Sequence, residues 1–280
     1  MSYPVSPLWF SPPRDLTSRI EKCINAVRDE RKSPESIVFF RADDVAVPGK
    51  GFTQLMDLFE RRRTPLSLAV VPAWLSGPRW WRLRAFTRGR SSQWCWHQHG
   101  WRHINHEPTG KKQEFGPNRT GAQIKSDLIR GRRRLEALMG EDFYPVFTPP
   151  WNRCDLSTLI LLKELGYHAV SRNNGNQPQP PDRLPDFYVN VDLHTRRERR
   201  STVGWDGLFK DLQQALISGF CGVMIHHQKM NKVAFEFLEM LLSVFSGCKD
   251  LSLVHFRDLV GFNDSSRLEN IFWGRKSETY

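Results

Sequence analysis

The sequence lacks the features of a membrane-spanning or exported protein. No apolar run approaches the roughly 18 residues that a membrane-spanning helix requires. The first residues, Met1 to Phe10, lack the basic segment and following apolar stretch that mark a secretion signal. These absences predict a cytoplasmic protein.

Cysteine is scarce and widely spaced. The chain has 5 cysteines, an odd number, and no two of them have the C-x-x-C spacing. Disulfide frameworks and cysteine-based zinc sites use even or closely spaced sets. We therefore expect free thiols and a reducing compartment.

The usual signatures of nucleic-acid-binding proteins are also missing. The sequence contains no zinc finger, no RNP-like aromatic motif and no basic arm, so nucleic acid is not expected as a partner. Positive charge is nevertheless in excess, with a net charge of +11, and part of it lies in short arginine runs. Such runs are most often solvated helix faces. The excess still favours anionic partners, which predicts a phosphate-bearing substrate and peripheral contact with a membrane surface.

Short apolar runs alternate with helix-like stretches along the chain. The predicted strands cover residues 37–40, 66–71, 94–96, 144–147, 168–171, 187–191, 222–225 and 251–254. The predicted helices cover residues 52–62, 120–139, 156–165, 208–217 and 233–245. This alternation predicts an α/β fold with a parallel sheet, open or closed into a barrel. With no internal repeat and no low-complexity linker, residues 1–280 are expected to form one domain.

Four of the nine histidines lie within ten residues, from His97 to His106. Imidazole is the commonest side-chain metal ligand. His99 and His103 are four residues apart, so a helical turn would bring both rings to one face. Two histidines and one carboxylate leave a coordination position open, as in catalytic zinc sites. His97 and His106 are expected to support the ligands or to replace one of them.

The expected carboxylates are Asp43 and Asp44, which follow the first predicted strand. Two carboxylates allow a division of labour, because one can bind a cation while the other accepts a proton. A turn or a helix cap is the alternative reading of this pair. Arg41 lies two residues before Asp43 and can share its strand face.

Three further polar stretches follow predicted strands. Strand ends of a parallel barrel share the face that carries active sites. The first stretch holds Pro150 and Trp151, where two prolines restrict the backbone and can present an N–H group and an indole. The second is Asp192, and the third begins with His226, which can act as a general acid beside it. A plain loop, a turn and a core histidine are the respective alternatives.

Taken in order, these stretches resemble the motifs of the polysaccharide deacetylases, carbohydrate esterase family 4. The matching stretches are Asp43-Asp44, His99 to His103, Thr148 to Trp151, Asp192 and Met224 to His226. The resemblance implies an irregular (β/α)7 barrel, with a motif-bearing core at about residues 37–260. It also implies a metal-dependent hydrolase that removes an acetyl group from an N-acetylated sugar. Because no export signal is expected, the implied substrate is a cell-envelope glycan precursor or a nucleotide- or lipid-linked sugar.

The resemblance further implies a role for each matching residue. Asp44, His99 and His103 bind a divalent metal, with zinc first and cobalt, nickel or iron as alternatives. Asp43 is the general base. The leaving amine is protonated by His226, which Asp192 orients. Substrate contacts are assigned to Pro150, Trp151, Arg153, Arg41 and His227.

Two departures from the family pattern bear on activity. Gly100 replaces the usual serine or threonine after the first metal-binding histidine. Thr148 stands where the family often has an arginine that steadies the base, and Arg41 or Arg153 is the expected substitute. A catalytically weak or inactive sugar-binding barrel is therefore the alternative function.

Overall fold

The computed structural model describes residues 5–30, 35–87 and 91–264. Its centre is a parallel sheet in the strand order β5-β4-β3-β2-β1-β7-β6, with β8 paired to the first half of β1. The strands are β1 (Ser36–Val45), β2 (Leu66–Val70), β3 (Trp94–His99), β4 (Phe143–Thr148), β5 (Ala169–Val170), β6 (Val191–Asp192), β7 (Phe220–Ile225) and β8 (Leu251–Val254).

The sheet curls into an irregular barrel. Isolated parallel bridges join Val170 to Asp186 and Asn173 to Val189, beside the short edge strand β5. The same segment continues into β6, which pairs with β7. The two ends of the sheet are thereby connected. The predicted parallel α/β barrel of the (β/α)7 type is confirmed.

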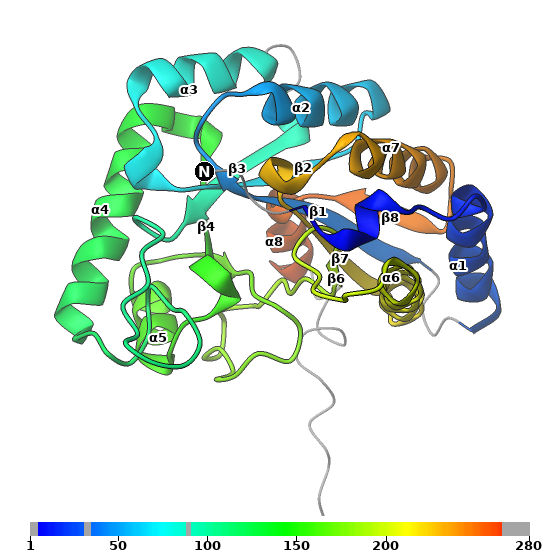
Figure 1. Ribbon diagram of the computed structural model, residues 1–280. Coiled ribbons are helices and arrows are strands. Elements are labelled where there is room, and N and C mark those ends of the chain that lie inside the picture. Colours follow the sequence, from blue (N-terminus) through cyan, green and yellow to red (C-terminus); the bar gives the residue numbers. More distant parts are fainter. Residues whose placement is uncertain (1–4, 31–34, 88–90, 265–280) are drawn as a thin grey trace, which may run out of the picture.

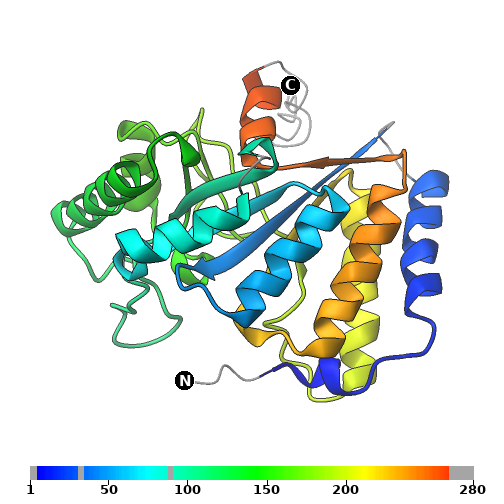
Figure 2. The ribbon, with the colours of Figure 1, turned by 90° about the horizontal axis from the view of Figure 1, so that it is seen from above.

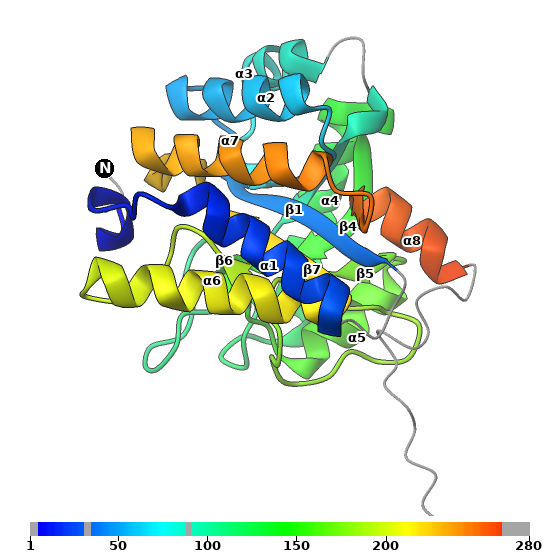
Figure 3. The same ribbon diagram turned by 90° about the vertical axis from the view of Figure 1, so that its right-hand side faces the viewer.

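Helices surround the curled sheet (Figure 1). They are α1 (Leu16–Glu30), α2 (Lys50–Arg62), α3 (Gly77–Arg84), α4 (Gly121–Met139), α5 (Leu156–Glu164), α6 (Ser201–Ile217), α7 (Lys232–Ser246) and α8 (Phe256–Asp264). Along one side of the barrel α2 packs beside α7 (Figure 2). The first helix, α1, packs against both α6 and α7 (Figure 3). No helix in the described part of the chain is long and apolar enough to span a membrane.

Strand β1 runs through the middle of the sheet and separates two packed regions. Successive side chains of a strand point to opposite faces. Val38 and Phe40 point outward into the layer of apolar side chains beneath the helices. Phe39 points into the barrel, where it packs with Phe220 and Phe256. The inward face of β1 continues through Arg41 to Asp43, so this alternation carries both side chains into the barrel interior.

The predicted elements differ from the structure at a few places. The strand expected at 187–191 is reduced to β6 and isolated bridges, because this segment crosses the seam between β5 and β7. Helices α1, α3 and α8 were not predicted. On α1 the buried residues Ile20, Ile24 and Val27 form a stripe with helical spacing.

Candidate active site

A cavity of about 630 Å³ lies at the carboxyl ends of the strands. Its walls come from the carboxyl-terminal parts of β1, β3 and β7 and from the segments that follow β3, β4, β5, β6 and β7. Asp43, Asp44, His99 and His103 lie in it, and His226 also contributes to the lining. The structure therefore brings together the acidic pair, two histidines of the cluster and the first histidine after β7.

Asp44, His99 and His103 form a group suited to a metal ion. Their ligand atoms all lie within 4.8 Å of one another. The Asp44 Oδ1 atom is 3.3 Å from His99 Nε2 and 3.2 Å from His103 Nε2. This oxygen is buried and has no hydrogen-bond partner among the residues that the structure describes. Distances of this size are those between neighbouring ligands of a tetrahedral ion with bonds of about 2.0–2.1 Å. The residues therefore fit a divalent metal.

The orientation of His99 is set by its other ring nitrogen. Its Nδ1 lies 3.0 Å from the backbone oxygen of Thr148, which also accepts the N–H of Gly100 at 3.1 Å. Because a carbonyl can only accept, Nδ1 carries the proton in this contact. The Nε2 atom is then the ring nitrogen that faces Asp44, and it can ligate a metal when it carries no proton. The end of β4 thus selects the ring nitrogen of His99 that is available to a metal.

The ionisation of Asp44 and His103 favours metal binding, whereas Asp44 raises the pKa of His99 against the opposing effect of burial. Burial would raise the pKa of Asp44, but His99, with smaller contributions from His226 and His103, lowers it below its usual range. Burial, aided by the neighbouring His99, lowers the pKa of His103 to about 4. A charged carboxylate and a neutral imidazole are the forms that ligate a cation.

The backbone around the cavity is strained. Six non-glycine residues of the described chain have positive φ angles: Asp44, Arg63, His103, Trp151, Asn152 and Arg183. All except Arg63 and Arg183 line the cavity. Such angles cost free energy for side chains with a Cβ and concentrate at functional sites. At His103 the positive φ shows that the expected helical turn is absent, and a tight loop brings the two rings together instead.

Asp43 forms a buried, two-pronged ion pair with Arg41. The guanidinium donates from Nε to Asp43 Oδ1 at 2.8 Å and from Nη2 to Oδ2 at 2.9 Å. The side chains are 0% and 3% exposed. Burial opposes ionisation, yet Arg41, aided by His99 and His226, lowers the pKa of Asp43. Arg41 does not line the cavity, so its predicted substrate contact is replaced by support of Asp43.

Arg41 is itself held by residues from two other strand ends. It donates to the Asn152 side-chain oxygen at 2.6 Å and to the Ser171 hydroxyl at 2.8 Å. That Arg41 takes the place of the arginine expected at position 148 stays a prediction, and its pairing with Asp43 agrees with it. Thr148 instead has its hydroxyl 2.9 Å from His97 Nε2, and burial lowers the pKa of His97 to about 3. His97 therefore lies beneath the site as a neutral side chain.

His226 lines the cavity, and its buried Nδ1 has no hydrogen-bond partner in the described part of the chain. The sequence predicts that Asp192 orients it, and the structure corrects this prediction. Asp192 Oδ1 accepts the backbone N–H groups of His194 and Thr195, and its Oδ2 accepts the Thr195 hydroxyl. The backbone N–H of His226 donates to His194 Nδ1 at 3.1 Å. Asp192 therefore shapes the turn after β6 and leaves the His226 ring to the cavity.

The other predicted substrate contacts divide into two groups. Trp151 and Arg153 line the cavity, and the ring centroids of Trp151 and His103 are 4.5 Å apart. Pro150 is buried and does not line it. His227 is 6% exposed, packs edge-on against Phe52 and also lies outside the lining. The single-residue step from His226 to His227 thus turns the second ring away from the cavity.

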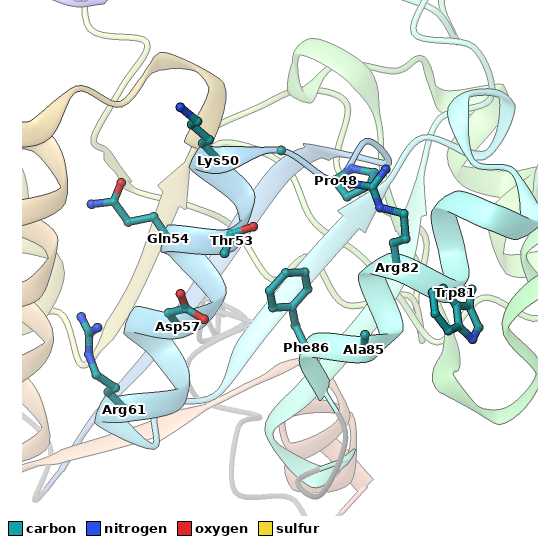
Figure 4. A pocket seen from close by; sticks show the side chains of 11 residues that line it. Pro48, Lys50, Thr53, Gln54, Asp57, Arg61, Trp81, Arg82, Ala85 and Phe86 are labelled. Carbon is teal, nitrogen blue, oxygen red and sulfur yellow. The ribbon is translucent and has the colours of Figure 1, made fainter.

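A larger cavity of about 700 Å³ lies on the outer side of the barrel, between α2 and the end of α3 (Figure 4). Phe86 reaches into it toward Thr53 and Asp57 of α2. None of the predicted site residues lines this cavity. The chemistry-bearing side chains gather in the cavity at the strand ends.

Glu114 is a site residue that the sequence did not reveal. It is fully buried in the long loop after β3, where its two oxygens accept the backbone N–H groups of Trp101 at 3.1 Å and Arg102 at 2.6 Å. Burial raises its pKa, although these backbone donors act in the opposite direction. A Cβ at Gly100 would clash with Glu114 Oε2 and with the Pro150 ring, and Gly100 has a φ of +60°. Glycine therefore suits this position because of its backbone conformation and because both neighbours approach it closely.

Replacing Glu114 by glutamine is expected to weaken metal affinity by about 10- to 100-fold, the range for groups that orient metal ligands. One of the two acceptors becomes a donor that faces backbone N–H groups, so the loop bearing His103 loses its anchor. Metal titration against a competing chelator measures the change. Glu164→Gln, on an exposed position of α5, is the matched control. Unchanged metal affinity in a folded Glu114→Gln variant would contradict the role of Glu114 in holding the loop that bears His103.

Comparison with known proteins supports the fold. No protein-family model and no curated protein matches the chain. A Mycobacterium smegmatis protein assigned to the polysaccharide deacetylases matches with a TM-score of 0.64 and 13% identity, over 84% of this chain and 92% of that chain. A Pseudomonas aeruginosa PAO1 protein with the same assignment has a TM-score of 0.60 and 14% identity, over 84% and 93%.

The chain has the fold of the polysaccharide deacetylases. The resemblance drawn from the sequence motifs is confirmed at this level. A mutant of a carbohydrate esterase family 4 pseudoenzyme from Bacillus anthracis also matches, with a TM-score of 0.52 and 12% identity, over 81% of this chain and 68% of that chain. Proteins assigned to the deacetylases and a mutant of a pseudoenzyme therefore share the fold, so the fold alone does not establish activity.

Proposed function

We propose that this protein is a metal-dependent hydrolase that removes the acetyl group from an N-acetylated sugar. The main support is the group of Asp44, His99 and His103, which lies in one cavity with the ion-paired Asp43. A metal-binding triad beside a separate charged carboxylate is the minimum needed to activate water and attack an amide. The fold shared with polysaccharide deacetylases agrees with this chemistry.

In this proposal Asp44, His99 and His103 hold a divalent metal, with zinc as the first candidate and cobalt, nickel or iron as alternatives. When bound, the ion supplies positive charge that polarises a carbonyl and makes a neighbouring water more acidic. The His99 tautomer set by Thr148 and the loop held by Glu114 keep the two imidazoles directed at the Asp44 carboxylate.

Asp43 is proposed as the general base. Arg41 lowers the pKa of the Asp43 carboxyl, so the carboxylate is ionised at neutral pH and can accept a proton from the attacking water. His226 is proposed to protonate the leaving amine, because its ring lines the cavity and its Nδ1 has no protein partner. Acetate and an amino sugar are then the products.

The remaining substrate contacts are proposed for Trp151 and Arg153. Trp151 presents its indole beside His103, and flat aromatic rings pack against the C–H faces of sugars. The backbone N–H of Trp151 is proposed to stabilise the developing oxyanion. A cell-envelope glycan precursor or a nucleotide- or lipid-linked sugar stays the proposed substrate, and the cytoplasmic location and the contact with a membrane surface likewise stay predictions.

The test combines metal analysis with an acetate assay. We expect one divalent metal per chain in the purified protein and release of acetate from at least one member of a panel of N-acetylated sugars. Chelation should stop the release, and re-addition of the metal should restore it. A folded protein that holds stoichiometric metal but releases no acetate from any member would contradict the hydrolase.

The alternative is a sugar-binding barrel without catalytic activity. It is favoured by one observation, the presence of a family 4 pseudoenzyme among the proteins that share the fold. The buried Arg41–Asp43 pair argues against a purely binding role. In this pair Arg41 can compensate for the arginine that is missing at position 148. The same assay separates the two functions, since a binding protein would retain the sugar without turnover under any metal.

A further inference from the structure

We propose that the cavity recognises a phosphate or diphosphate ester on its sugar substrate, through a rim of cationic side chains. This inference rests on the proposed deacetylase function and names the class of its substrate. The rim consists of Lys111, Lys112, Arg153, Arg197 and Lys229, all of which line the cavity.

The rim residues come from four separate connections of the barrel. Lys111 and Lys112 belong to the loop after β3, Arg153 follows β4, Arg197 follows β6, and Lys229 ends the short helix after β7. Four independent segments thus bring positive charge to one opening. A solvated charged face on one helix does not produce this arrangement, which is typical of a cavity that attracts an anion.

These cations have no carboxylate partner among the described residues, although neighbouring arginines do. Arg196 pairs with Asp211 and Glu198 at 2.6 Å each, while the adjacent Arg197 is exposed and forms no such pair. Among the described residues, the Arg153 guanidinium donates a hydrogen bond to the backbone oxygen of Lys112 at 3.5 Å. The positive charges of the rim are therefore available to a ligand.

The acidic residues of the cavity do not neutralise the rim. The carboxylates in the lining are Asp43 and Asp44, whose side chains are 3% and 10% exposed. Asp43 is already paired with Arg41, and Asp44 belongs to the metal-binding group. A neutral polysaccharide would leave the cations of the rim unpaired, whereas a phosphate ester accepts several charge-assisted hydrogen bonds from lysine and arginine.

Binding to the metal-free protein tests the rim without using activity. The probes are N-acetylglucosamine and N-acetylglucosamine 1-phosphate, compared by calorimetry at low and moderate salt. We expect the phosphorylated sugar to bind at least about tenfold more tightly, because one charge-assisted hydrogen bond is worth about that factor. The preference should shrink as salt increases. Equal binding of both sugars would overturn the proposal.

The triple variant Lys111→Gln/Lys112→Gln/Arg197→Gln is expected to lose this preference while keeping its fold, because all three side chains are exposed. The matched control is Lys22→Gln on the exposed surface of α1, which should keep the preference. A triple variant that still favours the phosphorylated sugar as strongly as the natural chain would also overturn the proposal.

Two further arms separate the sources of the phosphate. A nucleotide diphosphate sugar tests a soluble donor, and vesicles that carry a polyprenyl diphosphate sugar test a lipid-linked one. If either phosphorylated ligand binds more tightly than the neutral sugar, the result supports the proposed recognition of phosphate by the rim. Equal binding to anionic vesicles without any sugar would overturn it in favour of a membrane-surface contact. Failure of the hydrolase proposal is distinct, since it would abolish acetate release and leave the binding preference intact.

Discussion

An Asp44→Asn variant is expected to bind divalent metal at least about 100-fold more weakly and to lose acetate release to a similar degree. Removing a group that only orients a ligand already costs 10- to 100-fold, and Asp44 is itself the anionic member of the group. Asparagine has the same shape and tolerates the left-handed φ of 61° at this position. Metal content after dialysis and the acetate assay measure the two effects.

The matched control is His106→Gln, in the same histidine cluster. His106 lies outside the group formed by Asp44, His99 and His103, and its backbone, not its ring, is bonded to the surrounding loop. We expect it to leave metal content unchanged. If Asp44→Asn retained metal like the natural chain, or if His106→Gln lost it, the assignment of ligands would be wrong.

An Arg41→Met variant is expected to lower the free energy of unfolding by about 3–5 kcal/mol. This is the usual cost of removing one partner of a buried ion pair and leaving the other charge without compensation. Both side chains are almost completely buried, so no water can replace the guanidinium beside Asp43. The acceptors on Asn152 and Ser171 also lose their donor. Urea unfolding of the metal-free protein at neutral pH measures the loss.

The double variant Arg41→Met/Asp43→Asn tests whether the loss of stability in Arg41→Met comes from the unpaired charge of Asp43. Once the carboxylate is replaced, no uncompensated charge remains, so part of the lost stability should return. Coupling between contacting residues is usually 0.5–3 kcal/mol. A double variant that is as unstable as the sum of the two single variants would show that Arg41 acts by filling space and not by neutralising Asp43.

Much of the site was predictable because it depends on local geometry. Asp43 and Arg41 share the inward face of β1, as the alternation of side chains along a strand requires. His99 ends β3, and His103 follows it in a tight loop. Strand ends of a parallel barrel meet at one face, so residues at these ends converge without further information.

Other parts of the site depend on contacts that no local pattern encodes. Glu114 binds the start of the loop after β3 from more than ten residues further along the same loop, and only the close approach of Gly100 shows why glycine stands there. Asp192 ends a strand as predicted, yet it bonds to Thr195 in its own turn and not to His226. An aspartate at a strand end has both options, and the path of the following loop selects one.

The amino-acid pattern by itself determined the alternation of strands and helices, the parallel sheet and the strand ends that carry its polar side chains, because periodicity and strand polarity are local properties. Only the tertiary structure decided which of these side chains meet. It paired Arg41 with Asp43, turned His227 away from the cavity and gathered unpaired cations from four loops at one opening. These contacts follow from how distant segments pack around a closed barrel, and sequence neighbours do not specify such packing.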